Sequence, residues 1–286
     1  GQLQIVDRLK DMVRLGGGLD EHNNLSAESQ ARALATLAIF GERLKEMPQG
    51  TVRALGTNTL RKAKNSRDFL KRAEDALGHP IEIISGQEEG RIIYLGVAHS
   101  LADDAGARLV VDIGGGSTEL IIGERFESTE TESLHMGCVS FAQRFFTEGT
   151  ITEKAFDRAV TAARQEVLSI HANYRRLGWQ QAVGASGTIK AISQVCVDNG
   201  WSETGITMEG LKKARKKVIK AGQVEQLDIK GLREDRKAIF PSGLAILYGI
   251  FEQLGIEQME VSGGALREGL LYDLLGRFAH EDVRER

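Results

Sequence analysis

Segments with strand-like spacing of apolar residues alternate with segments of helical spacing along the first third of the chain. Runs with a strand-like pattern stand at 2–15, read as a strand or a strand pair, and at 51–57 and 81–85, and the segments between and after them repeat apolar side chains with helical spacing. The predicted helices are the stretch after Ser26 that carries Leu34, Leu37, Ala38 and Leu44, and the stretches 58–63, 66–77 and 87–101. This alternation is typical of an α/β sheet that is covered by helices.

A second series of elements follows the small and polar stretch 101–107. Residues 108–123 and 127–135 have the pattern of a meander of strands, and 152–177 that of a long helix. The remaining predicted elements are strands at 181–186 and 259–263 and helices at 187–197, 207–221, 244–256 and 264–278. The sequence therefore predicts two α/β domains, 1–104 and 105–286.

Composition adds three constraints. The 286 residues carry a net charge of -3, so no global field attracts a polyanion and no nucleic-acid partner is expected. Cys138 and Cys196 belong to no paired or metal-binding motif, which fits a reducing cytosol. No apolar run approaches the length of a transmembrane helix, so an integral membrane protein is not expected.

The stretch VVDIGGGSTEL, residues 110–120, carries an acid on each side of three glycines. It lacks the glycine spacing of a Rossmann fingerprint and of a P-loop. A hairpin that turns at Gly115 and Gly116 would place Asp112 opposite Glu119 on one face of a sheet. Like charges in such a pair are destabilising unless a cation lies between them, and Mg²⁺ suits carboxylates. The turn would then offer N–H groups to phosphate. The alternative is a hairpin whose acids are solvated or ion-paired.

Glu89 is a second candidate for chemistry. In ISGQEEGR, residues 84–91, Ser85 and Glu88 have the spacing of a capping box at the start of a helix. This leaves Glu89 without a structural role, and a carboxylate in a cleft can accept a proton from water. The alternative is that Glu89 only complements the helix dipole.

Arg61 is predicted in the first turn of the short helix 58–63, where the helix dipole disfavours a cation. An arginine in such a place can clamp phosphate with two hydrogen bonds. The alternative is an ion pair with Asp68 or another surface acid.

Two further stretches, VGASGTIK at 183–190 and VSGGALREG at 261–269, have the pattern strand, glycine turn, helix. Helix N-termini carry N–H groups that bind anions, and Lys190 and Arg267 are predicted in the first turns. The sequence GASGT is one residue short of a nucleophile elbow, so a serine hydrolase is not expected.

Six motifs spread over the chain resemble one family. DIGGGSTEL, GTNTLRKA, SGQEEGR, GASGTIKA, FPSGLAIL and SGGALREGLLYDLL together are similar to the exopolyphosphatase and guanosine pentaphosphate phosphatase family, a branch of the actin–Hsp70–sugar kinase superfamily. The resemblance implies two actin-like, ribonuclease H-like α/β domains with a cleft between them. It also implies hydrolysis of a terminal phosphoanhydride with Mg²⁺.

The resemblance implies roles for individual residues. Glu89 corresponds to the glutamate that activates the attacking water, and Arg61 to a phosphate-binding arginine, so both are expected to be catalytic. Asp112 and Glu119 correspond to the acids at the metal. The expected phosphate-binding residues are Gly114, Gly115, Gly116, Ser117, Thr118, Gly187, Thr188, Lys190, Gly263, Gly264 and Arg267.

The form GGGS and Lys190 are closer to the exopolyphosphatase branch. We therefore expect an exopolyphosphatase that releases terminal phosphate from inorganic polyphosphate. The alternatives are hydrolysis of guanosine pentaphosphate, a sugar-kinase-like phosphotransferase, and a sensor that binds such anions without turnover. The protein is expected in the cytoplasm, with homodimer formation and peripheral association with membranes left open.

The resemblance also implies segments outside the given sequence. The family's first phosphate loop is expected before Gly1, and the helical C-terminal domain of longer members is expected after Arg286. Both are expected to contribute to full activity.

Overall fold

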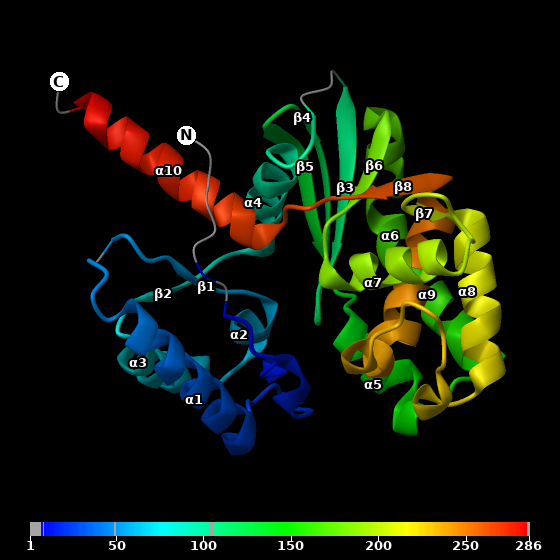
Figure 1. The fold of residues 1–286 in the computed structure, drawn as a ribbon, viewed down its shortest axis with the longest axis horizontal. Coiled ribbons are helices and arrows are strands. Elements are labelled where there is room, and N and C mark those ends of the chain that lie inside the picture. The colour runs from blue at the N-terminus through cyan, green and yellow to red at the C-terminus, as the bar shows by residue number, and fades with distance from the viewer. Residues whose placement is uncertain (1–6, 8, 49, 103–105, 285–286) are drawn as a thin grey trace. The chain divides into compact units, whose positions relative to one another are not determined.

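The chain divides into two compact units, Gly1–Ser85 and Gly86–Arg286 (Figure 1). The computed structural model describes residues 7, 9–48, 50–102 and 106–284, with side chains described up to Gly276. Each unit combines helices with a sheet that contains parallel strands, so the predicted α/β class is confirmed.

The first unit places helices beside a short parallel sheet. Strand β1 (Ala54–Gly56) pairs with β2 (Ile81–Ile83). The helices are α1 (Ala27–Leu44), α2 (Asn58–Lys62) and α3 (Ser66–Leu77). Ser26 caps α1 as predicted, because its side chain accepts a hydrogen bond from the Ser29 N–H. Helix α1 packs on α3 around the buried side chains of Ala33, Phe69 and Ala73.

The strand or strand pair predicted over 2–15 is wrong for the residues that the structure describes. Residues 1–6 and 8 lie outside the described part, whereas 9–14 form no strand. The apolar side chains of Leu9 and Met12 are 40% and 38% exposed, so this stretch lacks the buried face that would hold a strand in a sheet.

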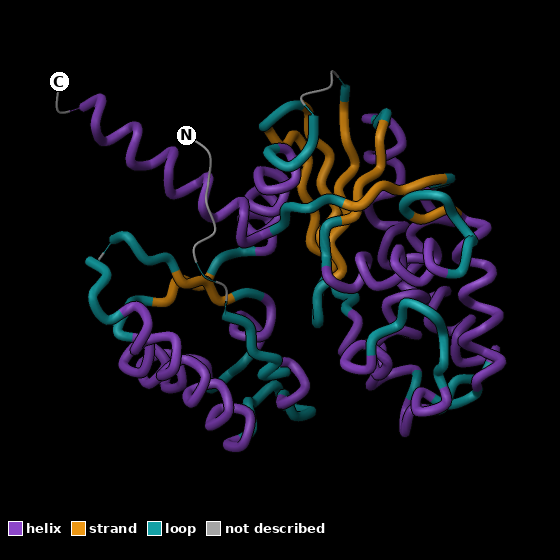
Figure 2. Tube along the Cα trace, in the orientation of Figure 1, coloured by secondary structure: helices purple, strands orange, loops and turns teal. Residues whose placement is uncertain are grey.

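The second unit is organised by a mixed sheet (Figure 2). Among the described residues the sheet has six strands in the order β5-β4-β3-β6-β8-β7. Their bounds are β3 (Ala107–Ile113), β4 (Thr118–Glu124), β5 (Glu127–Leu134), β6 (Gln181–Gly184), β7 (Ile206–Thr207) and β8 (Gln258–Val261). Strands β3, β6 and β8 run parallel, and β4 and β5 continue from β3 as the predicted antiparallel meander.

Helices cover both faces of this sheet. They are α4 (Gly86–Ala98), α5 (Cys138–Phe145), α6 (Glu153–Leu177), α7 (Gly187–Asp198), α8 (Met208–Ala221), α9 (Phe240–Leu254) and α10 (Leu266–Arg284). All but α5 were predicted from the sequence. Helix α4 lies against β3, β4 and β5 and also contacts α10, whereas α7 and α9 lie against β3 on the opposite side.

Side-chain alternation along β3 explains the two faces. Leu109, Val111 and Ile113 belong to the larger core with α5 to α9, and Val110 belongs to the smaller core beneath α4. Successive side chains of a strand point to opposite faces, so Asp112 follows Val110 onto the α4 face. Because of this alternation, the predicted site at Asp112 faces α4.

The domain limits predicted from the sequence and the two compact units of the structure assign α4 to different parts of the chain. The predicted domain limits, 1–104 and 105–286, assign α4 to the first domain. By its contacts, α4 belongs to the second unit, because Ile93, Tyr94 and Val97 pack on Val110 and Ile121 of the sheet. The domain limits inferred from the sequence stay a prediction.

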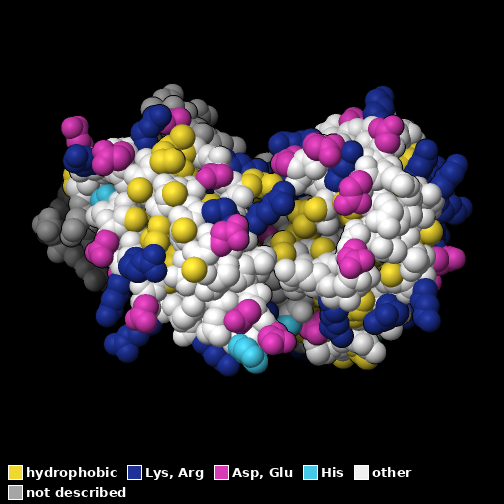
Figure 3. All heavy atoms as spheres, turned by 90° about the horizontal axis from the view of Figure 1, so that it is seen from below, with side chains coloured by type: hydrophobic (Ala, Val, Ile, Leu, Met, Phe, Trp, Pro, Cys, Tyr) yellow, Lys and Arg dark blue, Asp and Glu magenta, His cyan; other side chains and the backbone are white. Residues whose placement is uncertain are grey.

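Charged side chains of both signs are interspersed on the face shown in Figure 3. An anionic ligand therefore has to be held by local groups, as the net charge of -3 also implies. Within the described part of the chain, every helix is too short or too polar to cross a membrane.

Candidate active site

The glycine turn between β3 and β4 forms the predicted hairpin. Asp112 pairs with Glu119 in the strand register, and Ile113 pairs with Thr118. The N–H of Gly114 donates to the carbonyl oxygen of Ser117 at 2.9 Å and closes the turn. The prediction that the two acids lie directly opposite each other is therefore confirmed.

Glu89 approaches the same face of the hairpin from α4. Glu89 is buried, and it lies one helical turn before Ile93 and two before Val97, which both pack on the sheet. The helix can come this close because residue 90 is a glycine. A Cβ atom at Gly90 would lie 2.4 Å from Cγ2 of Thr131 on β5. The structure thus brings three predicted site carboxylates together.

The pKa values of Asp112 and Glu119 are both raised in this arrangement. Burial, and then the negative charge of Glu89, raise the pKa of Asp112 to about 7, while Lys190 opposes the shift. Burial and the charge of Glu89 also raise the pKa of Glu119 to about 8, against hydrogen bonds from Ser133 and Ser117. Like charges that cannot all ionise together are a frequent property of functional sites.

The glycine turn rests on the start of α5, the helix that the sequence pattern did not reveal. The N–H groups of Cys138 and Val139 donate to the carbonyl oxygens of Gly114 and Gly115, both at 2.9 Å. A Cβ atom at Gly137 would lie 2.4 Å from backbone atoms of the turn, so only glycine permits this contact. With its carbonyls held by α5, the turn keeps the N–H groups of Gly115 and Gly116 free of backbone acceptors within the described residues. Free consecutive N–H groups suit an anion.

The two other predicted turns meet at the carboxyl ends of β6 and β8. Ser186 caps α7 by accepting a hydrogen bond from the Ile189 N–H. The Lys190 ammonium donates to the carbonyl oxygen of Gly263 at 3.1 Å, and its charge also acts on Asp112. Lys190 therefore lies among all three turns. In open α/β sheets, ligands bind at this edge, beyond the carboxyl ends of parallel strands.

Several predicted phosphate ligands have structural partners instead. The Thr118 hydroxyl donates to the carbonyl oxygen of Met136 at 2.6 Å, and the Thr188 hydroxyl donates to Cys138 Sγ at 3.6 Å. Both side chains are buried, so they cannot turn to a ligand without losing these bonds. The Ser117 hydroxyl is likewise buried and bonded to Glu119. Phosphate binding by these residues stays a prediction, and it would rest on their backbone N–H groups.

The turn before α10 also has structural contacts, which involve Ser262 and Gly264. The Gly264 N–H donates to the Ser262 hydroxyl at 3.0 Å, and a Cβ atom at Gly264 would lie 2.1 Å from the carbonyl oxygen of Gly96 on α4. Gly263 and Arg267 are exposed. Arg267 lies in the first turn of α10, as predicted, 3.8 Å from Glu268.

Arg61 lies in the first unit, in a helix so short that its first turn is also its last. Helix α2 has only five residues, and Arg61 falls in its last turn, where the helix dipole favours a cation. Its guanidinium donates to the carbonyl oxygen of Ile84 at 2.7 Å. The dipole argument for a phosphate clamp therefore fails, and the role of Arg61 rests on the resemblance alone.

Glu88 has a structural role, as expected of the residue beside Glu89. Its two carboxylate oxygens accept hydrogen bonds from Arg91, both at 2.8 Å, and Arg91 also pairs with Asp273 of α10 at 2.7 Å. The ion pair between Arg91 and Asp273 joins α4 to α10. The capping box formed by Ser85 and Glu88 stays a prediction.

Arg236 is a candidate site residue that sequence patterns did not reveal. A Cβ atom at Gly187 would lie 2.9 Å from the Arg236 guanidinium, and the charge of Arg236 also reaches the Cys138 thiol. The side chain is 19% exposed and lies at the N-terminus of α7. The segment EDRKAIF has no periodic pattern, so only the tertiary structure places this cation beside the turn.

The carboxylates beside the glycine turn have the chemistry of a metal site. Among the residues that the structure describes, no group of three or more His, Cys, Asp or Glu side chains is arranged to hold a metal ion. The donor set nevertheless fits Mg²⁺, which is commonly bound by one or two carboxylates together with waters and substrate phosphate. The raised pKa values of Asp112 and Glu119 also identify a place where a cation would relieve repulsion.

A sheet edge that joins carboxylates, free N–H groups and a lysine has the chemistry that suits phosphate groups. The chain belongs to the Ppx/GppA phosphatase family, whose model matches residues 1–278. A protein of Vibrio cholerae named guanosine-5'-triphosphate,3'-diphosphate pyrophosphatase is 47% identical over 286 residues, which are 100% of this chain and 57% of that protein. The chain thus spans little more than half the length of the curated relatives that it matches.

Solved structures confirm the fold. The crystal structure of the Aquifex aeolicus member of the Ppx/GppA family superposes with a TM-score of 0.73 at 25% identity, over 97% of this chain and 91% of that one. An exopolyphosphatase from Cytophaga hutchinsonii superposes with a TM-score of 0.79 at 24% identity, over 92% and 88% of the two chains, and shows the fold alone. The resemblance seen in the six sequence motifs is therefore correct.

Proposed function

We propose that the protein hydrolyses the terminal 5'-phosphate of guanosine 5'-triphosphate 3'-diphosphate. The observation that carries the proposal is the meeting of Glu89, Asp112 and Glu119 beside the glycine turn. Support for the guanosine substrate comes from the name of relatives that are 47% identical over the whole chain. The inorganic polyphosphate preference inferred from GGGS and Lys190 has weaker support, because the similar exopolyphosphatase structure bears only on the fold.

Glu89 is the proposed general base. Its carboxylate takes a proton from water, the water oxygen forms a bond to the terminal phosphorus, and the bond from that phosphorus to the bridging oxygen breaks. The products are inorganic phosphate and guanosine 5'-diphosphate 3'-diphosphate. Such a transfer depends mainly on positioning and on stabilisation of charge, so a buried base held by a packed helix suits the reaction.

Other groups of the chain would hold the phosphate. The free N–H groups of Gly115 and Gly116 are proposed to bind non-bridging oxygens, and Lys190 to bring a positive charge to the same edge. Asp112 and Glu119 would hold Mg²⁺, which supplies charge neutralisation at the phosphate oxygens. Arg61 is proposed as a further phosphate ligand on the resemblance alone.

Phosphate release from different substrates tests the proposal. The chain, and a full-length form of the protein, would be assayed with guanosine pentaphosphate, with inorganic polyphosphate and with ATP, each with Mg²⁺. We expect release to be fastest from guanosine pentaphosphate and to need no acceptor other than water. Faster release from polyphosphate would instead identify the protein as an exopolyphosphatase. Product only with a sugar acceptor would indicate a kinase, and binding without release would indicate a sensor.

A further inference from the structure

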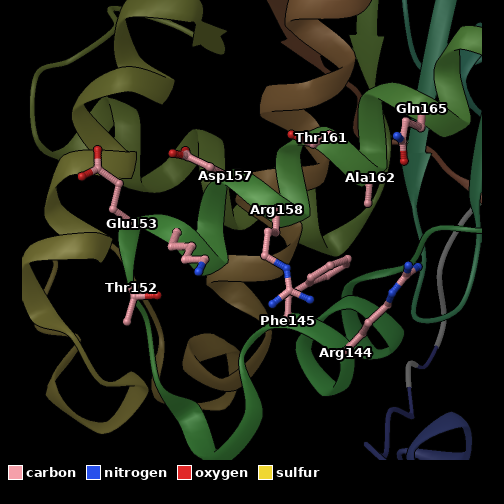
Figure 4. Close-up of a pocket in the computed structure, with 10 residues that line it drawn as sticks. Arg144, Phe145, Thr152, Glu153, Asp157, Arg158, Thr161, Ala162 and Gln165 are labelled. Atoms are coloured by element: carbon pink, nitrogen blue, oxygen red, sulfur yellow. The ribbon is translucent and has the colours of Figure 1, made fainter.

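A groove lies between the C-terminal end of α5 and the first half of α6 (Figure 4). Its volume is about 850 Å³. Helix α5 contributes Arg144 and Phe145, and α6 contributes Lys154 and Arg158 among other residues. None of these four residues was singled out by the sequence motifs or by the catalytic proposal.

Two arginines share one aromatic ring in this groove. The guanidinium carbon of Arg144 lies 4.9 Å from the centroid of the Phe145 ring, and that of Arg158 lies 6.0 Å from it. Figure 4 shows the ring between the two arginines. Phe145 is fixed in turn by an edge contact with Phe141, with ring centroids 5.0 Å apart. A guanidinium that rests on a ring keeps its N–H edge available for an oxyanion.

The two acids of the groove share one arginine that lies outside the residues lining it. Glu153 and Asp157 both pair with Arg215 of α8, at 3.1 and 2.8 Å. By contrast, Arg144, Lys154 and Arg158 are exposed and make no ion pair with any carboxylate among the described residues. With Arg215 counted, four cations stand against two acids, so the groove carries an excess of two positive charges.

We propose that this groove binds a chain of two or more phosphoryl groups. Phosphate oxygens match the fork of an arginine, and two such forks at one ring can hold neighbouring phosphoryl groups. The N-terminal end of α6, which begins after Thr152, lines the same groove and adds the positive end of a long helix dipole. Lys154 supplies a third positive charge on that first turn.

The groove is distinct from the carboxylate cluster. Helix α5 meets the glycine turn with its first residues, and the groove lies at its last ones. Eight helical residues span about 12 Å, so one phosphoryl group cannot contact both places. The proposal goes beyond the hydrolytic function and does not depend on it.

Calorimetric titration of the intact chain with tripolyphosphate, without divalent ions, tests the proposal. The variant carries Arg144→Gln with Arg158→Gln. The matched control carries Lys212→Gln with Lys216→Gln, which removes the same charge from exposed positions of α8. We expect the arginine variant to bind tripolyphosphate about ten-fold or more weakly at this groove, because two charge-assisted contacts are lost, and the lysine control to bind normally. Equal affinities of the two variants would overturn the proposal.

A local reporter separates this groove from the catalytic cluster. Phe145→Trp places an indole between the two arginines, and its fluorescence should change on addition of tripolyphosphate, also when Asp112→Asn is present. GTP in place of tripolyphosphate would show whether a nucleotide can carry the phosphoryl chain. No change with either ligand would contradict the proposal, and so would an equal response to citrate, because a patch that binds any trianion is not a phosphate site.

Discussion

Asp112 lies directly across the β3–β4 hairpin from Glu119, and both side chains share the sheet face that α4 covers. Like charges in this position are destabilising. The protein accommodates them beneath a helix that adds a third carboxylate, that of Glu89. Such an arrangement costs stability unless a cation or protons accompany it, which is why its effects can be measured.

The first prediction concerns pH and stability without divalent ions. The folded-state pKa values of Asp112 and Glu119, about 7 and about 8, lie above the ordinary values of 3.8 and 4.5. The folded protein therefore binds more protons than the unfolded chain between about pH 4 and 8, and this contribution to stability is lost as pH rises through the folded pKa values. Thermal unfolding in EDTA should show a fall in Tm across this window that is smaller in Asp112→Asn. Equal slopes would contradict the shared-face account.

The second prediction concerns Mg²⁺. If Asp112 and Glu119 hold the ion, Asp112→Asn should raise the Mg²⁺ concentration needed for half-maximal phosphate release, because an amide is a weaker ligand for a hard cation. Mg²⁺ should also raise the Tm of the native protein, and more at pH 8.5 than at pH 5.5, because the carboxylates are ionised at the higher pH. A metal requirement that the substitution leaves unchanged would remove Asp112 from the metal site.

The third prediction concerns the support of the glycine turn. Gly137→Ala places a methyl group 2.4 Å from the backbone of Gly115 and Gly116, so the turn or α5 must move. We expect a loss of roughly 1–3 kcal/mol in unfolding free energy, as for other overpacked sites, together with a large loss of phosphate release. Gly17→Ala is the matched control, since a Cβ atom there meets nothing within 4 Å. Native activity in Gly137→Ala would show that the turn does not need this support.

The hairpin could be predicted because strand register follows from simple geometry. Two flanking strands and a turn at Gly115–Gly116 fix which residues are opposite, and the structure has that register. The position of Glu89 above the same face could not be derived in this way. It depends on Gly90, which lets α4 reach β5, and no local pattern distinguishes that glycine from others in the sequence.

The sequence could not show which side chains find partners in the folded chain. The dipole argument for Arg61 needed a longer helix, because α2 ends at Lys62 after a single turn and Arg61 also lies in its last turn. Thr118 and Thr188 have the right chemistry for phosphate, yet their hydroxyls are bonded in the interior. Arg236 was not predicted, because its place beside Gly187 is set by a short 3₁₀ helix, Glu234–Ile239, whose sequence has no periodic pattern.

Glu89→Gln tests the central claim most directly. The substitution keeps the size of the side chain and removes the base, and general-base assistance is typically worth about 10² to 10⁴ in rate. Phosphate release from guanosine pentaphosphate would be measured for full-length native protein, Glu89→Gln and the neighbouring control Glu88→Gln, with Tm recorded for each. We predict that Glu89→Gln loses about 10²-fold or more of kcat with its Tm nearly unchanged, and that Glu88→Gln, whose partner is Arg91, stays within a few-fold of native turnover. Near-native turnover in Glu89→Gln would contradict the account.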